Sequence, residues 1–352
     1  MPIRRLPAEW EPQSFVQLTF PHADTDWADM LEPALACFTE IAVAVSRFEE
    51  VLIVCRNVEE TAARFSPEQA ARIRFAELPS NDTWARDHGG ITIEEDGSPV
   101  ILDFVFNGWG LKFPAFWDNQ ITQGLKDGGF FGAAPLRKGG LALEGGGLES
   151  DGQGTLLTTS ECLLSPNRNP HLDRSQTEQY LKELFGLQRV LWLDHGYLAG
   201  DDTDSHIDTL ARFCNADTIA YVQCNDPADE HYEALRAMET QLRSFVHPEG
   251  RPYRLVALPM PDACFAEDGH RLPATYANFL IINGAVLAPV YGLPQDAEAL
   301  AVLADCFPER EIVPVDCRVL IEQHGSLHCV TMQYSSGIVS ASAALGGNKR
   351  IR

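Results

Sequence analysis

The sequence has no CxxC pair, although it contains nine cysteines. Thiolate zinc sites use such closely spaced pairs, and disulfide frameworks use even numbers of cysteines in small secreted chains. Here the cysteines are spread singly over 352 residues. We therefore expect neither a disulfide framework nor a thiolate zinc site. Most of the cysteines should be small buried apolar residues, with at least one available for chemistry.

Long apolar runs are also missing. No stretch approaches the roughly 18 apolar residues that a membrane-spanning helix needs, and the opening MPIRR lacks the apolar core of a secretory signal. The chain has no linker rich in Pro, Gly or Ser and no low-complexity segment. We expect a cytoplasmic protein without membrane association. Hydrophobic residues make up 45% of the chain, enough for one large domain over residues 1–352.

Basic residues are scarce. The chain has 27 Lys and Arg against 50 Asp and Glu, which gives a net charge of −23. A surface without a basic stripe cannot neutralise phosphates, so nucleic acid is not expected as a partner. An acidic field does attract small cations, although keeping the protein in solution accounts for most of these charges. A homo-oligomer is compatible with the sequence.

Turn-forming pairs recur between apolar, β-branched runs. Asp-Gly at 96–97 and at 151–152 and Asn-Gly at 283–284 each predict a β-hairpin. A fourth turn is predicted at 216–217, where the glycine is replaced by aspartate. Positions 97, 152, 217 and 284 are separated by 55, 65 and 67 residues, so the hairpins indicate a loose internal repeat.

An amphipathic helix followed by a short apolar strand also recurs. The four pairs cover residues 32–48 and 51–55, 174–185 and 189–193, 228–245 and 253–258, and 295–306 and 311–315. Strand patterns at 14–20 and 328–334 remain at the two ends of the chain. If these two strands pair, the hairpin, helix and strand units close into a ring of about five units without open sheet edges. The predicted fold is a single-domain α/β propeller.

Polar residues at matching places in such a ring converge on its axis, and four segments are candidates. In the first, NDTWARDHGG at 81–90, Trp84 offers an apolar wall beside the carboxylate of Asp87. The alternative is a plain salt bridge between Arg86 and Asp87 with Trp84 in the core. In the second, LEGGG at 143–147, Glu144 stands before three glycines that allow close backbone approach to a ligand. A simple glycine turn is the alternative.

The third segment, DDTDSHID at 201–208, places four carboxylates and one imidazole within eight residues. If the segment is extended, Asp204, His206 and Asp208 point the same way because alternate side chains share a face. Such a density of charge requires a metal ion or a cationic substrate. No second histidine has ligand spacing, and the pattern differs from an EF-hand loop. Taken alone, the segment leaves open a metal site, cation-binding catalysis and a surface loop.

The fourth segment is HGSLHC at 324–329, in which Cys329 follows His328. A lone cysteine before a strand is usually just buried. A cysteine nucleophile, however, needs an imidazole to transfer protons, and a cationic substrate needs carboxylates. All of these groups are present on different predicted units. We therefore interpret Cys329 as a nucleophile.

Together these segments resemble the agmatine deiminase family, which includes the bacterial, Porphyromonas-type peptidyl-arginine deiminases, within the guanidino-group-modifying enzymes. The resemblance spans nearly the whole chain and implies a five-unit, pseudo-symmetric α/β propeller of the pentein type. The motifs that carry it are WARD at 84–87, FNGWG at 106–110, LEGGG at 143–147, DGQGTLLTT at 151–159, LLSPNRNP at 163–170, DDTDSHID at 201–208 and HGSLHC at 324–329.

The resemblance implies that Asp87 and Asp208 bind a guanidinium group, whose planar fork of donors suits paired carboxylates. His206 would act as acid and base, and Cys329 as the nucleophile of a covalent thiouronium intermediate. The further substrate-binding residues would be Trp84, Glu144, Asp202 and Asp204. No metal and no organic cofactor is expected. The expected reaction is the hydrolysis of agmatine to N-carbamoylputrescine and ammonia in putrescine and polyamine metabolism.

One departure leaves the substrate open. The family commonly has glycine where this chain has His324, so free or peptidyl arginine is an alternative that would give citrulline. Such a substrate carries a carboxylate and would need a basic group. The only candidates near the motifs are Arg86, Lys112 and Arg168.

Two alternatives do not use the cysteine. The first is a metal-dependent hydrolase built on Asp202, Asp204, His206 and Asp208. The second is a protein that binds a guanidinium group without catalysis. The intact set of carboxylates, histidine and cysteine favours the thiolate enzyme over both.

Overall fold

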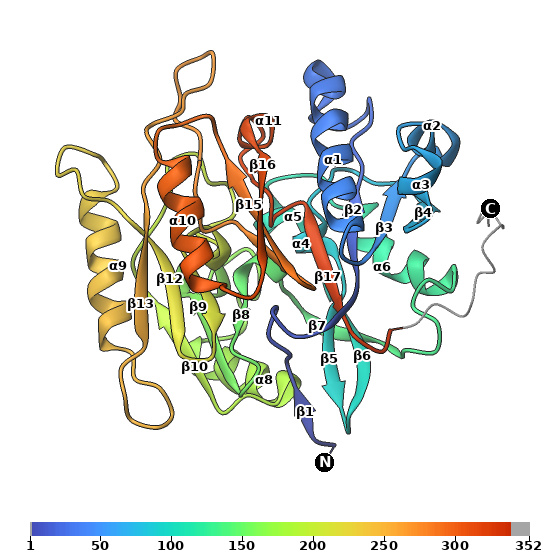
Figure 1. Ribbon diagram of the computed structural model, residues 1–352. Coiled ribbons are helices and arrows are strands. Elements are labelled where there is room, and N and C mark those ends of the chain that lie inside the picture. The colour runs from blue at the N-terminus through green and yellow to red at the C-terminus, as the bar shows by residue number, and fades with distance from the viewer. Residues whose placement is uncertain (1, 339–352) are drawn as a thin grey trace.

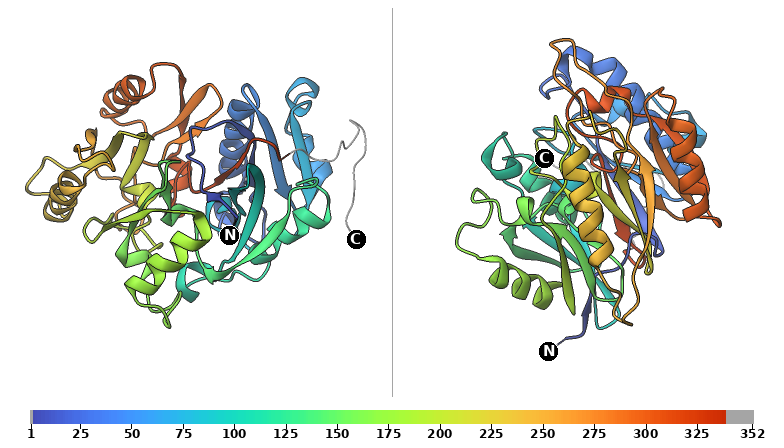
Figure 2. Two further views of the ribbon diagram at one scale, coloured as in Figure 1. Left: turned by 90° about the horizontal axis from the view of Figure 1, so that it is seen from below. Right: turned by 90° about the vertical axis from the view of Figure 1, so that its left-hand side faces the viewer.

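The computed structural model describes residues 2–338, whose strands form five small sheets. The sheets follow one another around a common centre in chain order (Figure 1 and Figure 2, left). Each sheet holds an antiparallel pair and a further strand parallel to one member of that pair. A parallel neighbour needs a crossover, and a helix supplies it in every unit.

The five units have the same order of elements. The first contains β5 (Ile91–Glu95), β6 (Ser98–Val105), α6 (Asp118–Asp127) and β7 (Leu136–Ala142). The second contains β8 (Glu149–Ser150), β9 (Thr155–Thr159), α8 (Arg174–Phe185) and β10 (Arg189–Leu193). The third contains β11 (Ala211–Asn215), β12 (Thr218–Gln223), α9 (Tyr232–Ser244) and β13 (Arg254–Pro259). The fourth contains β14 (Leu280–Ile282), β15 (Ala285–Val290), α10 (Asp296–Cys306) and β16 (Glu311–Asp316).

The fifth unit is assembled from both ends of the chain. It contains β17 (Thr331–Ser335), β2 (Gln13–Thr19), α1 (Leu31–Ser46) and β3 (Glu50–Cys55). β17 pairs antiparallel with β2, with Thr331 opposite Leu18. Two added strands, β1 (Arg4–Arg5) beside β5 and β4 (Ile73–Glu77) beside β3, extend the first and fifth sheets. The predicted pairing of the two end strands is confirmed.

Short helices fill the connections. The α-helices are α2 (Val58–Ala62), α3 (Pro67–Ala70), α4 (Ala85–His88), α5 (Gly108–Leu111), α7 (Ser160–Leu163) and α11 (Arg318–Ile321), and the 3-10 helices are η1 (Ala28–Met30), η2 (Gly145–Gly147) and η3 (Ile207–Thr209). Three of these short elements, α4, η2 and η3, directly precede the first strand of a unit. They therefore lie where the predicted ring gathers its polar residues.

The sequence patterns predicted most of this architecture. All four turns join antiparallel strands, and all four helix and strand pairs are present, so the predicted five-unit α/β fold is confirmed. α8 matches its predicted bounds because both of its ends carry strong signals. Asp173 and Gln176 form a capping box at its start, and Gly186 ends it with a left-handed φ of 69°.

Two features differ from the prediction. α6 and β7 were not predicted, because Trp117 gives α6 no side-chain cap at its start and β7, LRKGGLA, contains two glycines. The segment 201–208 is not extended, since Asp204 and Ser205 have φ of 66° and 60° and η3 follows. The prediction that Asp204 shares one face with His206 and Asp208 was therefore wrong.

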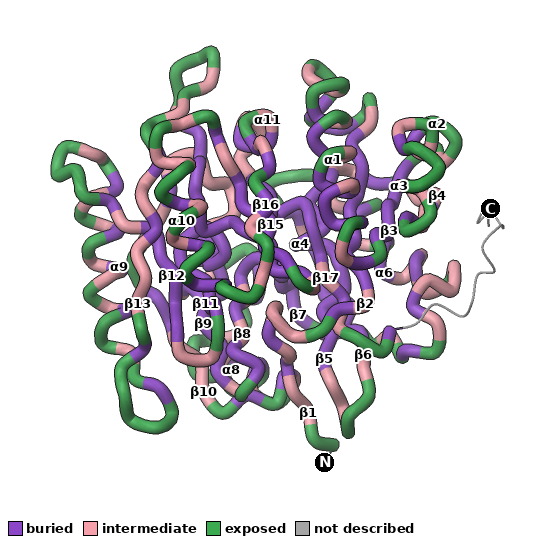
Figure 3. The backbone as a smooth tube through the Cα atoms, viewed as in Figure 1, coloured by how far each residue is buried: buried purple, intermediate pink, exposed green. Residues whose placement is uncertain are grey.

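The strands are largely buried, while α1, α9 and α10 expose their outer sides (Figure 3). The apolar core therefore lies between the helices and the sheets. Nearer the common centre of the ring, the buried side chains are charged or polar. Among them are Asp87, Glu144, His206, Asp208 and Arg212, each at most 4% exposed. No helix in residues 2–338 is both long enough and apolar enough to cross a membrane.

Candidate active site

Each of the five units contributes a polar residue from the same place, the segment just before its first strand. Asp87 precedes β5, Glu144 precedes β8, Asp208 precedes β11, Asn278 precedes β14 and Cys329 precedes β17. The repeat of the fold thus gathers these side chains at the common centre. His206, at the start of η3, joins them from the third unit.

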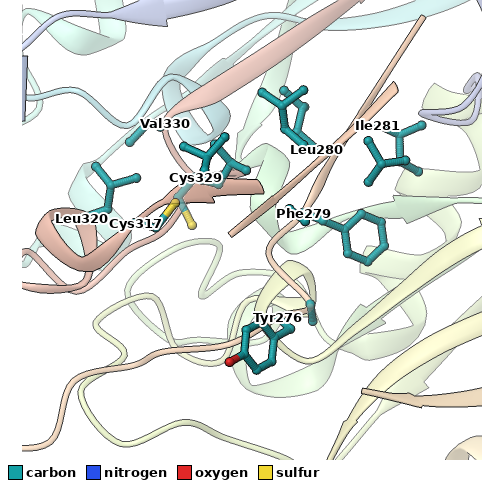
Figure 4. Packing of buried hydrophobic residues seen from close by; sticks show 14 of the residues in the cluster. Tyr276, Phe279, Leu280, Ile281, Cys317, Leu320, Cys329 and Val330 are labelled. Carbon is teal, nitrogen blue, oxygen red and sulfur yellow. The ribbon is translucent and has the colours of Figure 1, made fainter. Parts of the chain in front are cut away.

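Cys329 is buried, with 5% of its surface exposed. On one side it rests on the apolar core, where Figure 4 shows it among Cys317, Leu320, Leu280 and Val330. On its polar side, the Sγ atom lies 3.4 Å from the side-chain oxygen of Asn278 and 4.0 Å from Oδ2 of Asp208. The same Asn278 oxygen accepts hydrogen bonds from the backbone N–H groups of His328 and Cys329, at 2.9 and 3.3 Å. Asn278 therefore fixes the backbone that carries the sulfur.

The two aspartates predicted to bind the substrate lie on either side of this centre and are held differently. Oδ2 of Asp208 lies 2.7 Å from Nδ1 of His328, and its Oδ1 has no hydrogen-bond partner among the described residues. Asp87 accepts a hydrogen bond from the Trp109 indole at 2.9 Å and another from the backbone N–H of Gly146 at 3.0 Å. Both carboxylates are thus oriented by fixed donors.

His206 is fully buried between two carboxylates. Its Nδ1 lies 3.6 Å from Oδ1 of Asp87, and its Nε2 lies 3.6 Å from Oε2 of Glu144. Burial lowers the pKa of His206, but Asp87, the nearby Cys162 and Glu144 together raise it well above its ordinary value. The imidazole is therefore held in its protonated form, ready to donate a proton.

The pKa values of Cys329 and Asp87 are both raised, which favours the neutral thiol and opposes ionisation of the carboxyl group. Burial, with Asp208 and Asp87, raises the pKa of the Cys329 thiol well above its usual range. Burial likewise raises the pKa of Asp87 to about 6, although the positive His206 opposes this. Asp208 behaves differently, because the hydrogen bond and charge of His328 outweigh its burial and lower its pKa. An arriving cation would relieve the crowding of negative charge.

Glu144 and Asp204 belong to a separate ion cluster around Arg168. Nε of Arg168 lies 2.8 Å from Oε2 of Glu144, and its Nη1 lies 2.6 Å from Oδ2 of Asp204. The other oxygen of Asp204 lies 2.6 Å from Nζ of Lys112. Neither acid lines the pocket described next. Basic groups pair with both carboxylates, and the prediction that these two acids contact substrate stays a prediction.

A pocket leads from the surface to Cys329. Its charged lining consists of carboxylates, without Lys or Arg among the described residues, and its apolar walls are aromatic. The lining residues are Asp26, Asp82, Trp84, Asp87, Trp109, Phe113, Asp201, Asp202, Thr203, Thr209, Gln323, His324, Gly325 and Cys329. Of the predicted site residues, Trp84, Asp87, Asp202 and Cys329 are in this lining. The pocket suits a cation with an apolar chain.

Of the three glycines of η2, Gly146 approaches the predicted catalytic side chains, while Gly145 meets the backbone of Arg86 and Gly147 meets Cys162. A Cβ atom on Gly146 would lie 2.5 Å from Nδ1 of His206, 2.8 Å from Oδ1 of Asp87 and 3.2 Å from Oδ2 of Asp208. Only glycine fits there while its N–H donates to Asp87. The prediction that the backbone of these glycines approaches a ligand stays a prediction, while Gly146 packs against Asp87, His206 and Asp208.

The metal-dependent alternative does not match the geometry. Asp204 contacts Lys112 and Arg168, Asp208 contacts His328, and His206 lies between Asp87 and Glu144. Another combination, Glu144, Cys162 and His206, has ligand atoms within 4.8 Å of one another. Arg168 already neutralises Glu144 there, so the group is an ion-paired cluster rather than an open set of metal ligands.

Sequence reasoning missed several residues of the site. Trp109 lies in the motif FNGWG, to which no role was given, and His328 and Cys162 were also left without one. Arg168 was considered only as a partner for the carboxylate of an arginine substrate. Asn278 lies in no quoted motif. Its position could have been found from the repeat, because the residue just before each hairpin faces the centre.

Comparisons with known proteins agree with this geometry. The model of the Porphyromonas-type peptidyl-arginine deiminase family matches residues 5–335. The agmatine deiminase of Stutzerimonas stutzeri (strain A1501) is 34% identical over 357 residues, covering 95% of this chain and 96% of that protein.

Solved structures show the same fold. A Porphyromonas gingivalis structure described provisionally as an arginine deiminase superposes with a TM-score of 0.91 and 55% identity, covering 95% of this chain and 99% of that chain. An agmatine deiminase of C. jejuni, in a cysteine-to-serine variant with substrate bound, gives a TM-score of 0.90 and 39% identity, covering 96% and 97%. The similarity thus extends over essentially the whole described chain.

Proposed function

The chain belongs to the Porphyromonas-type peptidyl-arginine deiminase family, and from this we propose that it is a hydrolase of guanidinium groups whose substrate is agmatine. The observation that carries the proposal is the pocket itself. Cys329 lies at its inner end beside Asp87 and Asp208, and its lining holds carboxylates but no Lys or Arg among the residues that the structure describes. Agmatine is a chain of methylene groups with a cationic group at each end, which matches acidic ends and aromatic walls.

Binding begins with an exchange of cations. The guanidinium group enters between Asp87 and Asp208, and the free Oδ1 of Asp208 accepts one of its N–H groups. The positive charge now beside Cys329 favours the thiolate, so the S–H bond breaks and its proton passes to solvent. The net charge of the site is unchanged. This accounts for a thiol whose pKa is raised by burial and by the carboxylates of Asp208 and Asp87.

The first chemical step forms the covalent intermediate. The sulfur of Cys329 bonds to the guanidinium carbon, whose electrophilic character the two carboxylates preserve by keeping the group charged. His206 donates its proton to one terminal nitrogen, the C–N bond breaks, and ammonia leaves. A thiouronium cation remains attached to the enzyme, and His206 is neutral.

The second step is hydrolysis. Neutral His206 takes a proton from water while the water oxygen attacks the thiouronium carbon. The C–S bond then breaks, the sulfur takes up the hydroxyl proton, and N-carbamoylputrescine leaves. The proton released on binding and the ammonia together make ammonium, so the reaction balances without a redox partner. We assign Glu144 to positioning His206, and Trp84 and Trp109 to the walls along the methylene chain.

A second candidate is deimination of free or peptidyl arginine. It is favoured by the 55% identity to the Porphyromonas gingivalis structure described as an arginine deiminase. The lining of the pocket opposes it, because the substrate carboxylate would meet Asp201 and Asp202 at the rim. The basic residues that could bind the carboxylate of such a substrate either form ion pairs already or lie outside the lining of the pocket. Lys112 and Arg168 pair with Asp204, and Arg86 is buried behind the pocket.

Intact-mass measurement after acid quench tests the mechanism. With agmatine, we expect a covalent adduct whose mass equals agmatine minus ammonia, located on Cys329 by peptide mapping. Cys329→Ser should show neither adduct nor ammonia release. Cys264→Ser, which alters a partly exposed cysteine outside the pocket, should keep both. Turnover of C-terminal arginine peptides with inert agmatine would refute the substrate, and activity in Cys329→Ser that chelators abolish would refute the thiolate mechanism.

A further inference from the structure

His324 has a backbone conformation that an ordinary side chain rarely adopts. Its φ is 66°, in the left-handed region that favours glycine. Six described non-glycine residues have positive φ, and all but the hairpin residue Asp96 lie in the segments around the pocket: Trp109, Leu111, Asp204, Ser205 and His324. Strain of this kind persists only where surrounding contacts hold it. The strained backbone therefore marks the wall of the pocket.

The contacts that hold His324 come from separate loops. Its Nδ1 lies 2.8 Å from the carbonyl oxygen of Gly200, and 3.8 Å from a carboxylate oxygen of Asp202. Its ring stacks on His270, with centroids 5.3 Å apart and planes 16° from parallel. His324 thus joins the loop before η3, the loop before β14 and its own loop before β17. One side chain fastens three segments at the rim.

The backbone of the next residue, Gly325, is packed so tightly that the loop carrying His324 cannot move toward Trp84. A Cβ atom on Gly325 would lie 2.1 Å from the indole of Trp84, so the chain there is pressed against the aromatic wall. With Trp84 on one side and the Gly200 loop on the other, the imidazole of His324 is confined to the mouth. Both His324 and Gly325 line the same pocket as Cys329.

We propose that His324 is a specificity-determining residue that closes the outer end of the pocket. The imidazole leaves room for a guanidino compound whose chain ends in an unbranched amine. It excludes substrates with a further group on the terminal carbon, such as a carboxylate, an amide or a peptide. The proposal rests on the proposed guanidinium hydrolase and names the class of substrate that it selects.

Three substrates separate the effect of the size of the group on the terminal carbon from the effect of its charge. Agmatine ends in an amine, L-argininamide adds a neutral carboxamide on the terminal carbon, and L-arginine adds a carboxylate at that place. Two variants open the mouth while accepting the left-handed backbone: His324→Gly, and His324→Asn, which keeps an N–H donor for Gly200. His195→Asn is the matched control, because His195 is exposed, lies near Gly200 in the chain and is outside the pocket lining.

We expect the ratio of kcat/KM for L-argininamide to that for agmatine to rise at least about tenfold in His324→Gly, corresponding to 1.4 kcal/mol of discrimination. His324→Asn should give a smaller rise and His195→Asn none. L-Arginine should stay a poor substrate in every variant, because Asp201 and Asp202 still repel its carboxylate. Melting temperatures should not fall, since both replacements tolerate positive φ.

An unchanged ratio in both His324 variants would overturn the proposal, as would a wild-type enzyme that uses L-argininamide as well as agmatine. A rise for L-arginine without a rise for L-argininamide would also overturn it, because His324 would then select by charge and not by size. A failure of the proposed function is distinct. In that case, the wild-type protein releases no ammonia from agmatine, and no ratio can be formed.

Discussion

Glu144 and Asp204 share one arginine but differ in what else they touch. Both carboxylates bind Arg168, and only Glu144 lies beside His206. Although burial raises the pKa of Glu144, His206 and Arg168 lower it, so the residue stays ionised and supports the imidazolium. Replacing each acid in turn therefore separates a role in catalysis from a role in holding Arg168.

We expect Glu144→Gln to lower kcat by about 10- to 100-fold with a smaller change in KM. Loss of the negative charge should lower the pKa of His206, so the alkaline limb of the kcat profile moves to lower pH. Asp204→Asn should reduce the melting temperature without moving that limb. Profiles of kcat against pH for the three proteins test this. If both variants shift the limb equally, Glu144 does not act through His206.

Residue types and spacing indicated the chemistry of the site, but not which side chains contact one another. Cys329, His206 and Asp87 could be identified because a nucleophile, an imidazole and carboxylates have distinct side chains. The sequence did not show which of the carboxylates contacts His206. Glu144 and Asp204 look equivalent in the sequence, and only folding shows that Arg168 and Lys112 neutralise them. Partners distant in the chain decide what a charged residue does.

At the scale of elements, the short helix η2 sets the spacing of the catalytic side chains. Gly146 approaches His206 and Asp87 so closely that a methyl group would displace them. We expect Gly146→Ala to lower kcat/KM by about 100-fold, because small misplacements of reacting groups have effects of that size. The variant should still fold, which circular dichroism and thermal melting would show.

The control is Gly124→Ala in α6. A Cβ atom there meets only the flexible side chain of Leu78, at 3.0 Å, and alanine favours a helix more than glycine does. Its activity should equal that of the wild type. Near-normal activity in Gly146→Ala would show that the backbone at η2 can move aside, and the packing role assigned to the glycines would be lost.

The elements themselves could be predicted where local sequence determines them. Hairpins at 96–97 and 283–284 follow from turn chemistry, and α8 follows from its caps and its apolar period. α6 and β7 were not predicted because α6 begins without a side-chain cap, and because β7 contains two glycines and is placed by its pairing with β6. The conformation of the loop at 204–205 was not predicted for another reason. Its left-handed backbone is imposed by ion pairs of Asp204 that form only in the folded ring.

For the whole molecule, buried carboxyl groups predict how stability depends on pH. Burial raises the pKa of Glu49, Asp82 and Asp118 to about 7 and that of Asp87 to about 6. Between about pH 4 and 7 the folded state therefore binds more protons at these groups than the unfolded state, so the free energy of unfolding falls as pH rises. His206, whose pKa is raised by Asp87, Cys162 and Glu144 despite its burial, acts in the same direction.

We expect the ligand-free protein to melt at least about 3 °C higher at pH 5.5 than at pH 8. Calorimetry across that range would measure the difference. Asp118→Asn should reduce it, because the amide keeps the shape of a buried acid that accepts hydrogen bonds from the backbone of Asn81 and Asp82 but does not titrate. A melting temperature that rises from pH 5.5 to pH 8 would contradict the assignment of these groups.

The pairing of β17 with β2 has a consequence for how the protein is made. The ribosome completes residues 331–335 long after residues 13–19, because the other four units lie between them in the chain. β2 therefore has no partner until these units have emerged, and Cys329 emerges together with β17. The nascent chain has no assembled nucleophile until the fifth sheet can close the ring. Catalytic competence thus depends on the pairing of two strands that all the other units separate.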